Sequence, residues 1–154
     1  MAFTDRKAVG MRGWKDAFER LKTPWAQNDE DATVVALTEA LMWLDALNDW
    51  FTKTSPGWRA ATKGSIVEGA VYARNRAVHD LAVVLRLGRP HEPYTDYLID
   101  SYIPLNWKTF DEIDRPPPKH VKVDQGIAYE RHLGGQPVMD TINTVDQVLN
   151  THAP

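Results

Sequence analysis

Two stretches of the sequence decide its fold: residues 31–52, DATVVALTEALMWLDALNDWFT, and residues 65–88, SIVEGAVYARNRAVHDLAVVLRLG. In both, apolar residues recur at intervals of three and four, which is the spacing of one face of an α-helix. Ser65 and Glu68 form a capping-box pattern, and Gly88 suits the left-handed residue that ends a helix. The sequence therefore predicts one helix over 31–52 and another over 66–87, packed against each other as a hairpin.

Two further helices are predicted near the ends of the chain. The first covers residues 5–22, where Gly10 and Gly13 lower the helix propensity and Pro24 ends the pattern. The last covers residues 137–150 and begins with a proline, which is favoured at the first helical position.

The segment 89–136 is rich in aromatic residues and proline. The prolines of 116–118 cannot continue a helix, and the aromatic side chains of 94–110 need burial. We expect this segment to form an irregular arm that wraps a helical core made of residues 1–88. The whole chain, 1–154, is then a single all-α domain.

Composition limits the class of protein. The chain has 154 residues, a net charge of −3 and no cysteine, which fits one ordinary domain and excludes disulfides, thiolate nucleophiles and cysteine-ligated zinc. The charged N-terminal residues lack the apolar run of a signal peptide, and no apolar stretch is long enough to span a bilayer. These features predict a cytoplasmic protein without a membrane partner.

Charge is distributed unevenly. Residues 29–51 contain six acidic and no basic side chains, whereas residues 52–89 contain seven basic and two acidic ones. Opposite charges of this kind attract within a helical hairpin, and a basic segment is also able to present a phosphate-binding face. Ordinary solvated helix faces are the simpler interpretation.

The helix predicted over 66–87 carries a polar stripe. At 100° per residue, four side chains fall within about 60° of one another and give this face an acid, a phenol, an amide and an imidazole: Glu68, Tyr72, Asn75 and His79. Arg74 lies instead among apolar residues, where a guanidinium is costly unless it is paired. One explanation is an ion pair with an acid of the preceding helix, such as Glu39 or Asp45.

The other explanation is functional and starts from the spacing within RNRAVH, residues 74–79. An arginine, a polar residue directly after it, and a histidine five positions after the arginine resemble the R-x4-6-H signature of the HEPN superfamily. That family consists of small helical bundles, many of them metal-independent ribonucleases of toxin, defence and RNA-processing systems. The resemblance covers about residues 29–88 and implies a HEPN-like bundle.

The resemblance implies roles for individual residues. His79 is the expected general acid or base, Arg74 the phosphate-binding group and Asn75 the residue that orients them. A neutral imidazole takes the proton of a ribose 2′-hydroxyl, the guanidinium holds the scissile phosphate, and the product is a 2′,3′-cyclic phosphate. Two motifs meet across a homodimer in this family, so a homodimer acting on RNA is expected.

Three further residues of the motif helix are candidates for substrate binding: Glu68, Tyr72 and Arg76. On an ideal helix Arg74 and His79 are about 140° apart, which makes Arg76 the nearer cation unless the helix is distorted. The remaining histidines are isolated in sequence, so neither a metal site nor a cofactor is expected.

A non-enzymatic function is the alternative, because a fold does not fix a function. A HEPN-like bundle without catalysis is able to serve as an interaction or regulatory module, of an antitoxin-like or host-modulating kind, with a partner protein in place of RNA.

Overall fold

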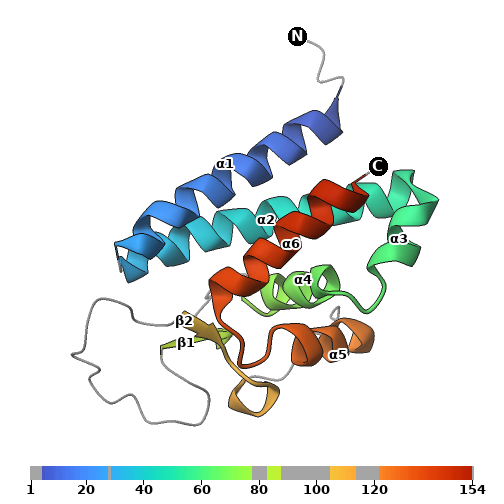
Figure 1. The fold of residues 1–154 in the computed structure, drawn as a ribbon. Coiled ribbons are helices and arrows are strands. Elements are labelled where there is room, and N and C mark those ends of the chain that lie inside the picture. The colour runs from blue at the N-terminus through green and yellow to red at the C-terminus, as the bar shows by residue number, and fades with distance from the viewer. Residues whose placement is uncertain (1–4, 28, 78–82, 88–104, 114–121, 154) are drawn as a thin grey trace.

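The computed structural model describes residues 5–27, 29–77, 83–87, 105–113 and 122–153. Within these ranges the chain is mostly helical, which confirms the predicted all-α class (Figure 1). The helices are α1 (Arg6–Ala26), α2 (Glu30–Thr54), α3 (Pro56–Thr62), α4 (Ile66–Arg76), α5 (Val123–His132) and α6 (Val138–His152). The remaining elements are strands β1 (Leu85–Leu87) and β2 (Leu105–Trp107) and a 3₁₀ turn, η2 (Phe110–Glu112).

The helical hairpin is formed by α1 and α2, the two longest helices of the described chain (Figure 1). The carboxylate of Asp5 accepts from the backbone N–H of Ala8 and begins α1, and Asp29 accepts from Ala32 in the same way to begin α2. The prediction that 31–52 is a long helix is confirmed. The prediction that its hairpin partner is 66–87 is wrong, because α1 continues through Pro24 to Ala26 and pairs with α2 along its length.

Two glycines explain why α1 and α2 approach so closely. A Cβ atom on Gly13 would lie 2.3 Å from the ring of Trp43, and one on Gly10 would lie 2.6 Å from the side chain of Leu47. Any larger residue at these positions would collide with α2. These glycines reduce the helix propensity of α1 but permit the contact that stabilises it.

Helix α4 is shorter than predicted. It begins after Ser65 as predicted, and the Ser65 hydroxyl accepts from the N–H of Val67, but Glu68 accepts from Gly64 and does not complete the predicted capping box. The helix ends at Arg76 instead of Leu87. Leu85–Leu87 forms β1, which pairs antiparallel with β2, and Leu85 lies opposite Trp107. The apolar run suits a helix and a buried strand equally, and long-range pairing with β2 decides between them.

The predicted irregular arm is wrong for the parts of 89–136 that the structure describes. Strand β2 bonds to β1 on one side and to residues 135–137 on the other, through Trp107 N–H to Gln136 and Gly135 N–H to Trp107. Residues 123–132 form α5, and the predicted C-terminal helix is confirmed as α6. Residues 88–104 and 114–121, including the proline run, lie outside the described residues.

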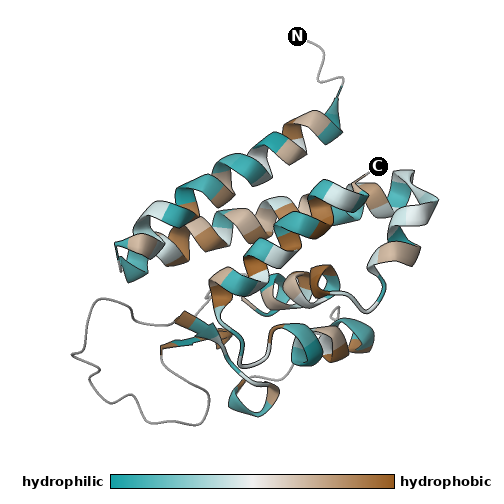
Figure 2. Cartoon of the chain, viewed as in Figure 1, coloured by the Kyte–Doolittle hydropathy of each residue, from teal (hydrophilic) through white to brown (hydrophobic). Residues whose placement is uncertain are grey.

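The core lies between α4 and the elements around it. Helix α4 contacts α2, α3, α5 and α6, and Figure 1 shows it between α6 and α5. Figure 2 shows brown and teal residues alternating along α6, as expected for a helix with one buried face. That face consists of Val138, Ile142, Val145 and Leu149, all fully buried. No helix in the described ranges is both long and apolar enough to cross a bilayer.

Replacing Gly13 with alanine tests the close contact between α1 and α2. The added Cβ would displace the Trp43 ring, so we expect Gly13→Ala to destabilise the protein by about 1–3 kcal/mol although alanine is the better helix former. Gly57 in α3 is the matched control, because a Cβ there meets nothing within 4 Å. Chemical denaturation measures both; a Gly13→Ala protein as stable as Gly57→Ala would contradict the packing role.

Candidate functional site

The last turn of α4 holds Arg74, Asn75 and Arg76, and Ala77 caps it with its N–H bonded to the carbonyls of Ala73 and Arg74. The structure thus brings Arg74 and Asn75 together at one end of a helix. His79 lies outside the described residues, so its predicted role beside them stays a prediction.

Arg74 reaches across to α2. Its Nη1 lies 3.3 Å from Oδ2 of Asp45, and the same atom donates to Oδ1 of Asn75 at 3.0 Å. Of the two acids proposed as ion-pair partners of Arg74, Asp45 is therefore the correct one, whereas Glu39 pairs with Arg20 of α1. The side chains of Arg74 and Asp45 are 31% and 29% exposed, so water weakens the pair to about 1 kcal/mol or less.

Burial raises the pKa of the Asp45 carboxyl above its ordinary value of 3.8. The Arg74 guanidinium opposes the rise, and the nearby Asp49 adds to it. A carboxyl whose pKa is higher in the folded than in the unfolded state reduces stability when it is ionised, at pH values above its folded pKa. Arg74 offsets part of that cost.

Tyr72 is a core residue. It is buried, and its ring packs on Phe110 at 5.8 Å and on Tyr129 at 5.1 Å between ring centres. Desolvation raises the pKa of the Tyr72 phenol, with the nearby Arg76 opposing the rise. The predicted polar stripe is thus broken at this position, because α5 and η2 cover the phenol.

Glu68 has a local structural role. Its Oε2 accepts from the N–H of Gly64 at 2.7 Å, one residue before the N-cap, where a carboxylate also suits the helix dipole. The side chain is partly exposed and lines a cleft.

Arg76 is 8% exposed and lies on the other side of α4, near the two buried tyrosines. A partly buried arginine, Arg86 of β1, forms an ion pair with Glu112 of η2 in the same region. The expected roles of Arg76, Tyr72 and Glu68 in substrate binding stay predictions; of the three, only Glu68 lines the cleft.

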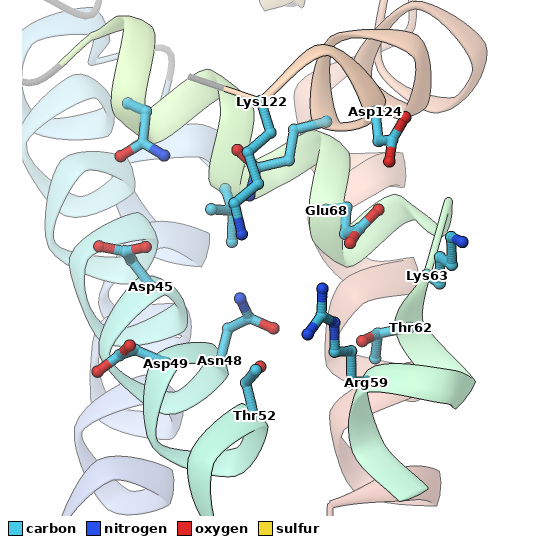
Figure 3. Close-up of a pocket in the computed structure, with 13 residues that line it drawn as sticks. Asp45, Asn48, Asp49, Thr52, Arg59, Thr62, Lys63, Glu68, Lys122 and Asp124 are labelled. Carbon is cyan, nitrogen blue, oxygen red and sulfur yellow. The ribbon is translucent and has the colours of Figure 1, made fainter. Parts of the chain in front are cut away.

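The cleft lies between α2, α3, α4 and the start of α5 and measures about 350 Å³. Asn75 lines it from α4, and Asp45 and Asn48 line it from α2. Figure 3 shows two cations that extend into the cleft: Arg59 of α3 and Lys122, the residue directly before α5. Sequence analysis missed these cations because Arg59 lies between the two predicted helices 31–52 and 66–87, and Lys122 lies in the predicted irregular arm. The excess of basic residues in 52–89 is a sequence signal for Arg59, and Lys122 lies outside that segment.

A larger hollow of about 610 Å³ lies between the start of α1 and the second half of α2. Its lining is more apolar and includes Val9, Trp43 and Trp50. None of the motif residues lines it, so the polar cleft beside α4 is the candidate site. Among the described side chains, no group of three or more histidines and acids has the geometry of a metal site.

No family model matches this chain, and the comparisons with curated proteins and with solved structures gave no significant match either. Its function is therefore argued from its residues and their geometry.

The ion pair predicts an asymmetric response to mutation. Arg74→Ala leaves a half-buried carboxylate without its partner, so we expect a loss of about 1 kcal/mol and a fall in Tm of about 2–4 °C at neutral pH. Asp45→Asn removes the ionised group and should change stability by less than about 0.5 kcal/mol, and it should rescue most of the Arg74→Ala loss.

Thermal unfolding as a function of pH checks this expectation. The Arg74→Ala loss should shrink as the pH falls through the raised pKa of Asp45, because protonation removes the unpaired charge. Arg12→Ala is the control, since its pair with Asp16 is highly exposed at 3.7 Å. An Arg74→Ala protein that behaves like Arg12→Ala at every pH would show that the pair with Asp45 is not structural.

Proposed function

We propose that the chain is a HEPN-like RNA-binding protein and a metal-independent endoribonuclease, with Arg74, Asn75 and His79 at its site. The observation that supports this function is the placement of Arg74 and Asn75, hydrogen-bonded to each other in the last turn of α4, with Asn75 lining a polar cleft. The sequence motif that they begin continues to His79 within five residues of Arg74.

The local geometry is compatible with phosphate binding by Arg74. Its ion pair with Asp45 is partly exposed and weak, so a phosphodiester group is able to replace the carboxylate as its partner at little cost. A guanidinium offers two parallel donors to phosphate oxygens. The Asn75 amide accepts from Arg74 through its oxygen, and its nitrogen remains a donor toward the substrate.

His79 supplies the proton transfer in this proposal. A neutral imidazole removes the proton of the ribose 2′-hydroxyl, the resulting oxygen attacks the adjacent phosphorus, and the 5′-oxygen of the next nucleotide leaves with a proton. The products are a 2′,3′-cyclic phosphate and a free 5′-hydroxyl. Since the nucleophile belongs to the substrate, DNA is not cleaved.

Only part of α4 is available for the contact between two subunits of the proposed homodimer. Most of α4 is buried within its own chain, and the partly exposed part is a strip that includes Glu68, Arg74 and Asn75. A dimer that joins two motifs therefore uses the end of α4 and the residues after it.

A regulatory or interaction module without catalysis is the second candidate. The observation that favours it is the same ion pair, because Nη1 of Arg74 already contacts both Asp45 and Asn75 in the free chain. In that case Arg74 fixes α4 against α2, and the protein acts through a partner protein.

Cleavage of RNA in the presence of EDTA separates the two candidates. We expect the purified protein to cut mixed-sequence single-stranded RNA with or without chelator, to leave 2′,3′-cyclic phosphate ends, and to spare DNA of the same sequence. His79→Ala should lower the rate by roughly 10²–10⁴-fold, and Arg74→Lys should also lower it, because lysine cannot bind phosphate through two parallel donors.

The control is His152→Ala, which removes an exposed histidine from the end of α6 and should leave the rate unchanged. Circular dichroism establishes that each variant is folded, and light scattering measures the mass. A folded protein that cuts no RNA, or cuts equally well after His79→Ala, would support the non-catalytic module.

A further inference from the structure

The cleft beside α4 contains charges of both signs, but they differ in whether they have partners. Asp45 pairs with Arg74, the Asp49 carboxylate pairs with Lys53 at 2.6 Å, and Glu68 accepts from the Gly64 backbone. In contrast, the structure records no ion pair for the three cations of the lining among the residues it describes: Arg59, Lys63 and Lys122. Two acids of the lining, Glu68 and Asp124, also have no ion pair in the described parts of the chain, so the unpaired charges of the cleft sum to one positive charge.

Neutral donors add to this arrangement. The Oδ1 of Asn48 accepts from the indole N–H of Trp58 at 3.0 Å, which fixes the amide so that its nitrogen is free to donate. Figure 3 shows that nitrogen turned toward the space between α2, α4 and Lys122. Thr52 also lines the cleft, and its hydroxyl has no hydrogen bond within the described parts of the chain.

Trp58 holds this side of the cleft in place. It is 2% exposed, packs against Phe51 at 4.8 Å between ring centres, and bonds to Asn48. Arg59 follows directly in α3, so its starting position is set by a buried aromatic anchor. The cleft is thus preorganised on the side formed by α2 and α3.

We propose that this cleft binds one ribose phosphate unit of the RNA strand, next to the Arg74–Asn75 pair. Arg59 and Lys122 hold the phosphate, with Asn48 and Thr52 as neutral donors. Glu68 accepts from a ribose hydroxyl through Oε1, because Oε2 already accepts from the N–H of Gly64. A ligand with an anion and hydroxyl donors explains why acids and cations share one cleft. This inference rests on the proposed RNA-binding function.

Titration of a fluorescein-labelled single-stranded RNA octamer tests the subsite, with anisotropy as the readout and His79→Ala as the background to prevent cleavage. Arg59→Ala/Lys122→Ala should weaken binding at least tenfold and reduce the slope of log K against log salt by about 0.7, as expected when one phosphate of a single strand is no longer neutralised. The matched control is Lys15→Ala/Arg131→Ala, which removes two exposed cations from α1 and α5 and changes the net charge equally.

Glu68→Gln tests the hydroxyl contact. The glutamine oxygen still accepts from Gly64, but its other group is now a donor and no longer accepts from a ribose hydroxyl. We expect the ratio of RNA to DNA affinity, measured with an octamer of the same sequence, to fall severalfold. An unchanged ratio would overturn the role of Glu68.

If Arg59→Ala/Lys122→Ala and Lys15→Ala/Arg131→Ala weaken RNA binding equally, the subsite is overturned, because RNA is then attracted by the overall charge of the protein. The proposed function is not affected by that result. If the protein neither binds nor cuts RNA, the proposed function fails, and ribose 5-phosphate alone decides the subsite. Shifts of the Asn48 and Asn75 amide signals in NMR spectra, abolished by Arg59→Ala/Lys122→Ala, would then support a ribose phosphate site. No shift at millimolar ligand would overturn it.

Discussion

The position of α4 at the centre of the molecule is the constraint on which the rest of the structure depends. Gly69 allows α5 to approach α4 so closely that a Cβ atom there would lie 2.8 Å from Leu133 and 3.0 Å from the carbonyl oxygen of Ala128. Ala70 and Ala73 are fully buried, and their small size permits similar proximity to the neighbouring helices. Because α4 is surrounded in this way, only its last turn and one polar strip are accessible to a ligand.

That burial gives the two sides of α4 different chemistry. On one side, Tyr72 stacks with Phe110 and packs at a tilt against Tyr129, and burial raises the pKa of both tyrosine phenols. On the other side, Asn75 and Glu68 meet the polar residues of α2 and α3 around a solvent-accessible cleft. The side chains that sequence analysis grouped as one polar stripe are therefore divided by the packing of α5, and ligand chemistry is concentrated on the cleft side.

Local sequence signals predicted the parts of the fold that depend on local interactions. The period of α2, the presence of a C-terminal helix and the start of α4 at Ser65 follow from helical spacing and capping, and the structure has all three. The end of α4 was not predictable in this way, because residues 85–87 pair with residues 105–107 across a distance that no local pattern encodes.

The site was predictable to a similar degree. Sequence analysis gave an ion pair with Asp45 as one of its explanations for Arg74, and the structure has that pair. The cations Arg59 and Lys122 reach the cleft only through the tertiary arrangement of α3 and α5. Gly10 and Gly13 also show that local propensity does not determine what the tertiary packing requires. Judged by local propensity they weaken α1, whereas the contact with Trp43 and Leu47 requires them.

The backbone hydrogen bonds that join β2 to both β1 and residues 135–137, called here the β2 junction, have a consequence for the order of folding. Strand β2 joins β1, about 20 residues earlier, to the segment at 135–137, about 30 residues later, whereas α1 and α2 are neighbours in the chain. Contacts between distant segments form only after the entropy of closing their loops has been lost, so the helical hairpin forms first and the β2 junction late. The nascent chain therefore holds α1 and α2 together before β2, α5 and α6 arrive to cover α4. During that interval the apolar face of α4 is exposed, and the interval ends when α5 and α6 pack against α4.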